Sequence, residues 1–150
     1  MATTETLFSP PGAGHTLDVL GAASIYKARA AQTGSRFSVM EQSVPPGYAV
    51  PVHRHQDEDE ALYVLDGEIV VDWGKGPQRA RTGALLFAPR GTFHTFRNET
   101  TAAARLLVIC SPGARIEACF TEFDAAARDT GLTPDGIGAI AARHGIEIAA

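Results

Sequence analysis

Three of the five histidines stand beside predicted turns, and their spacing is suited to metal chemistry. Residues two apart in an extended strand point to the same face, so His53 and His55 can direct both imidazoles to one point. Glu60 lies one short connection later, and His94 comes from a distant segment. Three imidazoles and one carboxylate suit a divalent transition metal, and fewer than six protein ligands leave positions for water, dioxygen or a substrate oxygen.

A pair of histidines alone is more often a surface or core feature than a metal site, so the surrounding residues decide the interpretation. The two segments read Gly47-x5-His53-x-His55-x4-Glu60-x6-Gly67 and Gly83-x5-Pro89-x-Gly91-x2-His94-x3-Asn98. At every fixed position the chain is similar to the two motifs of the cupin superfamily. We expect the glycines to form turns, without a chemical role.

The resemblance implies an all-β fold, an antiparallel jelly-roll β-barrel that holds one metal ion inside, near one mouth. Carried over to this chain, it implies the metal ligands His53, His55, Glu60 and His94. The identity of the divalent ion stays open among Fe(II), Mn, Ni, Cu, Co and Zn, because all of these accept such a ligand set.

An acidic run, Gln56-Asp57-Glu58-Asp59, separates the histidine pair from Glu60. Such a run could raise metal affinity through its negative potential, but a charged turn is usually a solvated loop, and we interpret it so. Glu58 is an alternative to Glu60 as the ligand. We prefer Glu60, because its spacing to Gly67 fits the motif and because it directly precedes an apolar strand.

Four side chains are candidates for binding a substrate beside the metal: Phe96, Tyr63, Phe37 and Met40. Phe96 is the best of these, because it lies two positions after His94 and shares its strand face. Met40 and Gln42 share one face of the strand just before the first motif, and both are weaker candidates than the aromatic residues. Aromatic residues in strands more often belong to the core, and that alternative applies to the whole set.

Frequent glycines and prolines divide the first two thirds of the chain into short β-branched and aromatic segments, without a helix long enough for a parallel crossover. This pattern predicts an antiparallel barrel or sandwich with strands at 24–31, 36–44, 62–71, 80–88, 94–98 and 104–110.

The remaining residues change in character and predict two short helices. The first runs over 121–131, with Thr121 as N-cap, and the second follows Thr133, with Pro134 at its first position. We therefore expect a cupin barrel with an N-terminal leader over 1–112, and a C-terminal helical extension of the same domain over 113–150.

Composition excludes several classes of protein. With 13 basic and 17 acidic residues the formal charge is -4, which argues against a nucleic-acid surface. The sequence carries no recognisable signal peptide and no apolar stretch long enough for a membrane span, so we expect a cytoplasmic protein that does not act at a membrane. Cys110 and Cys119 are expected to be buried thiols. Exposed edge strands and amphipathic tail helices predict a homodimer.

The ligand set resembles that of quercetinase-like cupins, which implies a metal-dependent dioxygenase acting on a small enol or phenol, with dioxygen as a co-substrate. Glu60 would then be both a metal ligand and the catalytic base. The alternatives are a non-redox lyase, isomerase or cyclase that uses the same ion as a Lewis acid, and a ligand-binding cupin without turnover.

Overall fold

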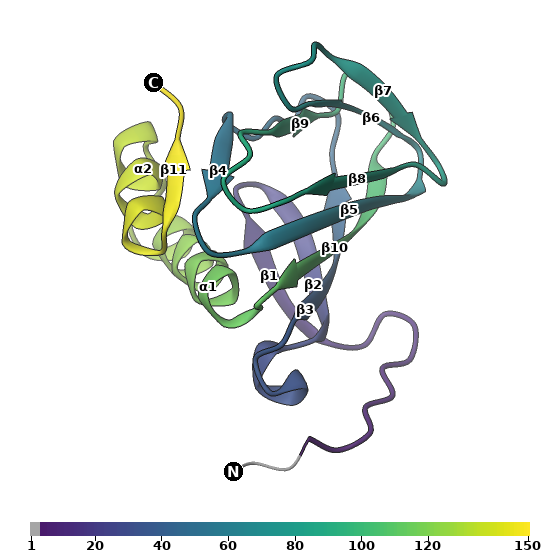
Figure 1. Ribbon diagram of the computed structural model, residues 1–150, viewed down its shortest axis with the longest axis vertical. Coiled ribbons are helices and arrows are strands. Elements are labelled where there is room, and N and C mark those ends of the chain that lie inside the picture. The colour runs from purple at the N-terminus through teal and green to yellow at the C-terminus, as the bar shows by residue number, and fades with distance from the viewer. Residues whose placement is uncertain (1–3) are drawn as a thin grey trace.

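The computed structural model describes residues 4–150, and its strands form antiparallel sheets that curl into a jelly-roll β-barrel (Figure 1). The larger sheet has the strand order β1-β2-β3-β10-β5-β8, a second has β7-β6-β9, and a short one has β11-β4. The strands are β1 (His15–Val19), β2 (Ala22–Ala28), β3 (Ser38–Val44), β4 (His53–His55), β5 (Asp59–Asp66), β6 (Glu68–Asp72), β7 (Gln78–Arg81), β8 (Leu85–Ala88), β9 (Thr95–Arg97), β10 (Ala104–Ser111) and β11 (Ile146–Ile148).

The central strands of the larger sheet alternate between the barrel interior and its outer face. In β3 every second residue from Ser38 onward is buried, and β10 pairs with β3 so that Val108 lies opposite Met40 and Leu106 opposite Gln42. Side chains opposite each other in a ladder share a face, so these four line the interior. The predicted all-β antiparallel fold is confirmed.

Two predicted strands are each divided in the structure by a glycine. The segment 62–71 splits into β5 and β6 at Gly67, and the segment 80–88 splits into β7 and β8 around Gly83. Both glycines have positive φ, 86° and 92°, which a residue with a side chain rarely adopts. The chain therefore turns from one sheet to the other at these positions, where the prediction had continued the strands.

The C-terminal helices are α1 (Ala114–Asp129) and α2 (Pro134–Arg143), and they test the two predicted caps. Thr133 accepts a hydrogen bond from the Gly136 amide at 3.1 Å, as predicted for an N-cap. The predicted start of the first helix at Thr121 is wrong. Thr121 lies inside α1, and its hydroxyl donates a hydrogen bond to the Glu117 carbonyl. The N-cap of α1 is Gly113, which packs closely against the backbone of Phe37 and Ser38.

The segment 113–150 lies across one mouth of the barrel, where α1 and α2 flank the short sheet (Figure 1). β11 pairs with β4 so that Ile146 lies opposite His55 and Ile148 opposite His53. The last strand is therefore hydrogen-bonded to the strand that carries the histidine pair.

Residues 1–3 of the expected leader lie outside the described residues. Neither described helix is long and apolar enough to span a membrane.

Candidate metal centre

The structure brings together the four side chains that the two motifs single out. His53 and His55 come from β4, Glu60 from β5, and His94 from the residue before β9. Each offers one ligand atom, and these atoms all lie within 4.8 Å of one another. The Glu60 carboxylate lies 2.7 Å from His94 Nε2 and 3.1 Å from His55 Nε2. The cluster is thus compact enough for one ion.

Backbone contacts fix the orientation of two of the imidazoles. His53 and His94 exchange backbone hydrogen bonds of 3.0 and 2.8 Å, which holds the two segments together. His53 Nδ1 lies 2.7 Å from the Pro51 carbonyl, and His94 Nδ1 lies 2.9 Å from the Thr92 carbonyl. A carbonyl can only accept, so each Nδ1 carries the proton and each Nε2 is the free ligand atom.

The charges of the cluster depend on one another. Burial opposes ionisation of Glu60, but the adjacent His55 and His94 hold its pKa well below the usual value. Burial also opposes charge on His55, and the neighbouring carboxylates of Glu60 and Glu58 outweigh it and raise its pKa to about 9. Burial and the nearby His94 lower the pKa of His53 to about 4. The buried Glu60 carboxylate thus lies among imidazoles whose positive charge can balance its negative charge.

This donor set fits a divalent cation. Both ring nitrogens of His55 are buried and have no hydrogen-bond partner among the described residues. A buried polar atom without a partner is costly, and a cation at the centre of the cluster would use Nε2 as a ligand. Three nitrogens and one carboxylate oxygen match the preferences of first-row transition ions.

Comparison with known proteins agrees with the fold and the cluster. The cupin domain family matches residues 40–110, the stretch that contains all four candidate ligands. The solved structure of a sugar phosphate isomerase from Silicibacter pomeroyi, a member of the cupin superfamily, is 28% identical in sequence. Its TM-score is 0.55, and the match covers 62% of this chain and 60% of that chain. The chain belongs to the cupin superfamily.

Two further relatives extend this placement. TT1209 from Thermus thermophilus is 37% identical, with a TM-score of 0.50 over 53% of this cupin and 75% of that chain. The tetracenomycin polyketide synthase protein TcmJ of Streptomyces glaucescens is 33% identical over 67 residues. That match covers 45% of this cupin and 45% of TcmJ, so less than half of the curated relative's length is matched.

The sequence had indicated that the acidic run beside the histidines is a solvated loop, but only part of the run is exposed to solvent. Gln56 and Asp57 are exposed and Asp59 binds Arg90, but Glu58 is only 1% exposed. Its Oε2 atom lies 3.7 Å from His55 Nδ1. The interpretation as a solvated loop is therefore wrong for Glu58. The alternation of strand faces could have identified it, because Glu58 has the same parity as Glu60.

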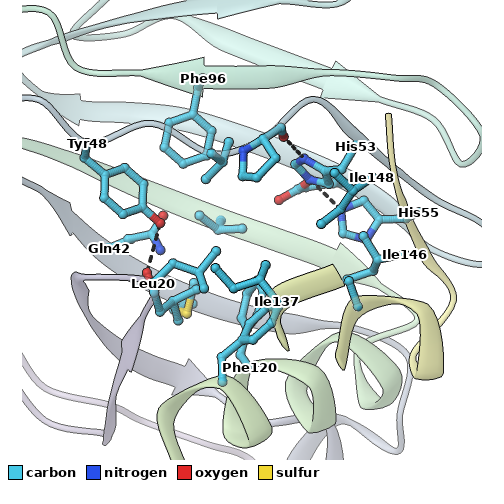
Figure 2. Close-up of a pocket in the computed structure, with 18 residues that line it drawn as sticks. Leu20, Gln42, Tyr48, His53, His55, Phe96, Phe120, Ile137, Ile146 and Ile148 are labelled. Atoms are coloured by element: carbon cyan, nitrogen blue, oxygen red, sulfur yellow. Dashed lines mark hydrogen bonds and ion pairs between the residues drawn. The ribbon is translucent and has the colours of Figure 1, made fainter. Parts of the chain in front are cut away.

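An apolar pocket opens from the cluster into the barrel (Figure 2). Its cavity volume is about 60 Å³. His53 and His55 lie at one end, and Tyr48 and Gln42 lie at the other. The Tyr48 hydroxyl already donates to the Val19 carbonyl at 2.9 Å, which leaves the buried Gln42 amide as the polar group at that end. Among the described residues of the lining there is no lysine or arginine.

Of the four expected substrate-binding residues, Phe96 and Met40 are buried in the pocket wall. Tyr63 and Phe37 are each 39% exposed and lie outside that wall, so the expectation needs correction for these two. The cause is strand alternation. Tyr63 has the opposite parity to Glu60 and pairs with Leu85 and Leu107 on the outer face.

The C-terminal segment supplies a wall of the pocket that the motifs did not reveal. Its lining residues are Phe120, Phe123, Ile137, Ala141, Ile146 and Ile148. The only sequence signal was the apolar stripe of the second helix, which required a docking surface without saying which one.

Proposed function

We propose that this cupin is a metal-dependent enzyme that acts on a small, largely apolar substrate bearing an enol or phenol oxygen. One divalent first-row transition ion would be held by His53, His55, Glu60 and His94. The observation that carries the proposal is the position of this cluster at one end of a largely apolar pocket. Such a pocket binds a ligand by its apolar body and orients it by a few polar groups.

The composition of the pocket discriminates among substrate classes. Its described lining has no lysine or arginine, the side chains that most often pair with a phosphate or a free carboxylate once water is excluded. The reaction named for the Silicibacter pomeroyi relative, isomerisation of a sugar phosphate, therefore fits this pocket poorly. A ring-containing substrate of the kind that the resemblance to a polyketide synthase protein suggests fits it better.

Different residues of the pocket would bind the substrate and transfer its proton. When bound, the cation would supply Lewis acidity to a ligated oxygen and, if redox-active, electron exchange. Glu60 would accept the proton of the enol or phenol, since its carboxylate faces the centre of the cluster. Phe96 and Met40 would pack against the rings, and Gln42 would hydrogen-bond a distant oxygen.

Two reactions start from this complex. In the first, a quercetinase-like dioxygenase, dioxygen is a co-substrate that is incorporated into the activated ring. In the second, a cyclase, isomerase or lyase, the ion would supply only Lewis acidity to a carbonyl, and the substrate would undergo no redox change. The resemblance to TcmJ supports a polyketide-type substrate and is compatible with either reaction.

Metal exchange separates these reactions. Protein purified without a metal-affinity tag is analysed for bound metal, then stripped and reloaded with zinc or with the native ion. A panel of flavonols and polyhydroxylated aromatic ketones is assayed with and without oxygen. Activity that needs oxygen and is lost with zinc supports the dioxygenase, whereas oxygen-independent activity of the zinc form supports the non-redox reaction. Ligand binding without turnover by any metal form would overturn the enzyme proposal.

We also propose a homodimer, formed through the outer face of the larger sheet. Leu85 and Phe87 of the end strand β8 are 64% and 58% exposed, and the exposed Tyr63 lies opposite Leu85 on β5. A contiguous apolar surface beside a free sheet edge suits a second copy of the chain. The tail helices, by contrast, pack on their own barrel.

Light scattering tests this assembly. Wild-type protein is expected at twice the monomer mass of 15.8 kDa, and Phe87→Asp at the monomer mass with unchanged metal content. A monomeric wild type across a wide concentration range would contradict the proposal.

A further inference from the structure

Glu58 differs from the other acidic residues of its turn. It is 1% exposed, whereas its neighbour Asp57 is exposed and pairs with Arg115. Neither carboxylate oxygen of Glu58 has a hydrogen-bond partner among the described residues. A carboxylate is rarely buried unless it serves a cationic or proton-donating partner. The structure offers one such partner, the imidazole of His55.

The three histidines of the cluster differ in what holds their Nδ1 atoms. His53 Nδ1 and His94 Nδ1 donate to backbone carbonyls two residues earlier, at 2.7 and 2.9 Å. His55 Nδ1 has no such carbonyl, and the nearest acceptor is Glu58 Oε2, 3.7 Å away. That separation is an ion-pair contact, longer than a hydrogen bond. Glu58 thus occupies beside His55 the place that a carbonyl occupies beside each of the other two.

Glu58 lies behind His55 and outside the group of ligand atoms. The atoms that lie within 4.8 Å of one another belong to His53, His55, Glu60 and His94, and Glu58 is absent from this set. Its effect on a bound ion would therefore pass through the imidazole. A carboxylate in this position fixes the tautomer and ring orientation of a ligating histidine and increases its basicity.

Charge gives a second reason for a buried carboxylate here. With neutral imidazoles, Glu60 alone would leave one positive charge on a divalent ion inside the barrel. A second carboxylate brings the buried site to neutrality, and an uncompensated buried charge is costly. The pairing of β5 with β10 places Cys110, a buried thiol, opposite Glu60, which adds no formal charge.

We propose that Glu58 is a positioning residue of the metal centre, whose carboxylate orients His55 through its ion-pair contact with Nδ1 and completes the charge balance of a bound dication. This inference rests on the metal site of the proposed function. It assigns Glu58 neither substrate contact nor direct coordination.

Metal affinity, measured without any substrate, tests the proposal. Apo wild type, Glu58→Gln, Glu58→Asp and the matched control Asp57→Asn are titrated with zinc and cobalt(II) in competition with a fluorescent chelator. Glu58→Gln is expected to bind zinc roughly 10- to 100-fold more weakly, the usual effect of removing such an outer partner. Glu58→Asp should recover part of the affinity, and Asp57→Asn should resemble wild type, because Asp57 is exposed.

Nitrogen NMR of the zinc forms gives a readout that a merely structural role would not move. In Glu58→Gln the Nδ1 resonance of His55 should shift, while those of His53 and His94 stay in place, because their acceptors are backbone carbonyls. Circular dichroism and thermal melting of the apo proteins check the fold.

The outcomes distinguish the two proposals. If wild type binds no stoichiometric metal, the proposed function fails. If wild type binds one equivalent and Glu58→Gln binds it as tightly as Asp57→Asn, with an unchanged His55 resonance, the inference about Glu58 is overturned. If Glu58→Gln does not fold, Glu58→Asp decides by the same two measurements.

Discussion

The histidine end of the pocket and one of its apolar walls come from different regions of the chain. The polar end is built by β4, β5 and the residue before β9, all within the residues 40–110 that match the cupin domain family. Much of the apolar wall is built by α1, α2 and β11, which lie outside that match. We infer that the barrel determines which chemistry is available, and that the C-terminal segment determines which molecule fits.

The largest effect is expected at the barrel end. Replacing His94 by Ala removes a proposed metal ligand whose Nε2 lies 2.7 Å from the Glu60 carboxylate, so stoichiometric metal should be lost. His144→Ala is the control, because this histidine pairs with Glu122 at the end of α2 and should leave the metal content unchanged. Elemental analysis of the purified proteins measures both. A full equivalent of metal in the His94 variant would refute the assignment.

The opposite pattern is expected at the C-terminal wall. Phe120→Ala removes an apolar ring from the pocket, so affinity for a flavonol such as quercetin should fall about tenfold while metal content stays the same. Calorimetric titration of the metal-loaded protein measures the affinity. Phe8→Ala, at a position that is 84% exposed, is the control. Loss of metal with unchanged ligand affinity would reverse the roles of the two regions.

Gln42 sharpens the comparison, because it is a barrel residue at the end of the pocket far from the histidines. Gln42→Leu keeps the approximate volume and removes the amide, so quercetin affinity should fall about threefold, the effect of one modest hydrogen bond. The affinity for 3-hydroxyflavone, which keeps the 3-hydroxyl group but lacks the hydroxyl groups that quercetin carries on its two outer rings, should change little. Equal losses for both ligands in the same titration would show that the amide makes no hydrogen bond to a distant oxygen.

The smallest effect concerns the docking of the two helices. His144 and Arg143 hydrogen-bond to Glu122 and hold its pKa below the usual value. A depressed pKa in the folded state stabilises the fold above the unfolded-state pKa, and this contribution is lost as the pH falls through the folded value. Glu122→Gln should therefore lower the melting temperature slightly at pH 7 but not near pH 3. Glu5→Gln is the exposed control in the same melts, and an equal difference at both pH values would contradict the prediction.

The sequence predicted local features well where a few neighbouring residues determine them. The i, i+2 spacing of His53 and His55 predicted a shared strand face, and Thr133 with Pro134 predicted the start of α2. The prediction failed where a contact with residues far away in the sequence determines the local structure. Thr121 has the chemistry of an N-cap, but α1 begins earlier because Gly113 fits against the backbone of Ser38, where a Cβ would be 2.5 Å from the Ser38 nitrogen.

The errors at the site have related causes. Glu58 was assigned to solvent because its neighbours are charged, and averaging over the run concealed the alternation that buries it. Tyr63 was considered for the pocket by residue type, although its parity places it on the outer face. The C-terminal wall of the pocket depends on where residues 113–150 dock, and no local pattern encodes that position.

The pairing of β11 with β4 bears on the order in which the protein assembles. About ninety residues separate the two strands, so their contact closes a long loop and is expected to form late in folding. During synthesis, residues 146–148 leave the ribosome after every barrel strand, and until then the edge of β4 on that side has no partner. A nascent chain could thus complete its barrel before the histidine strand is secured.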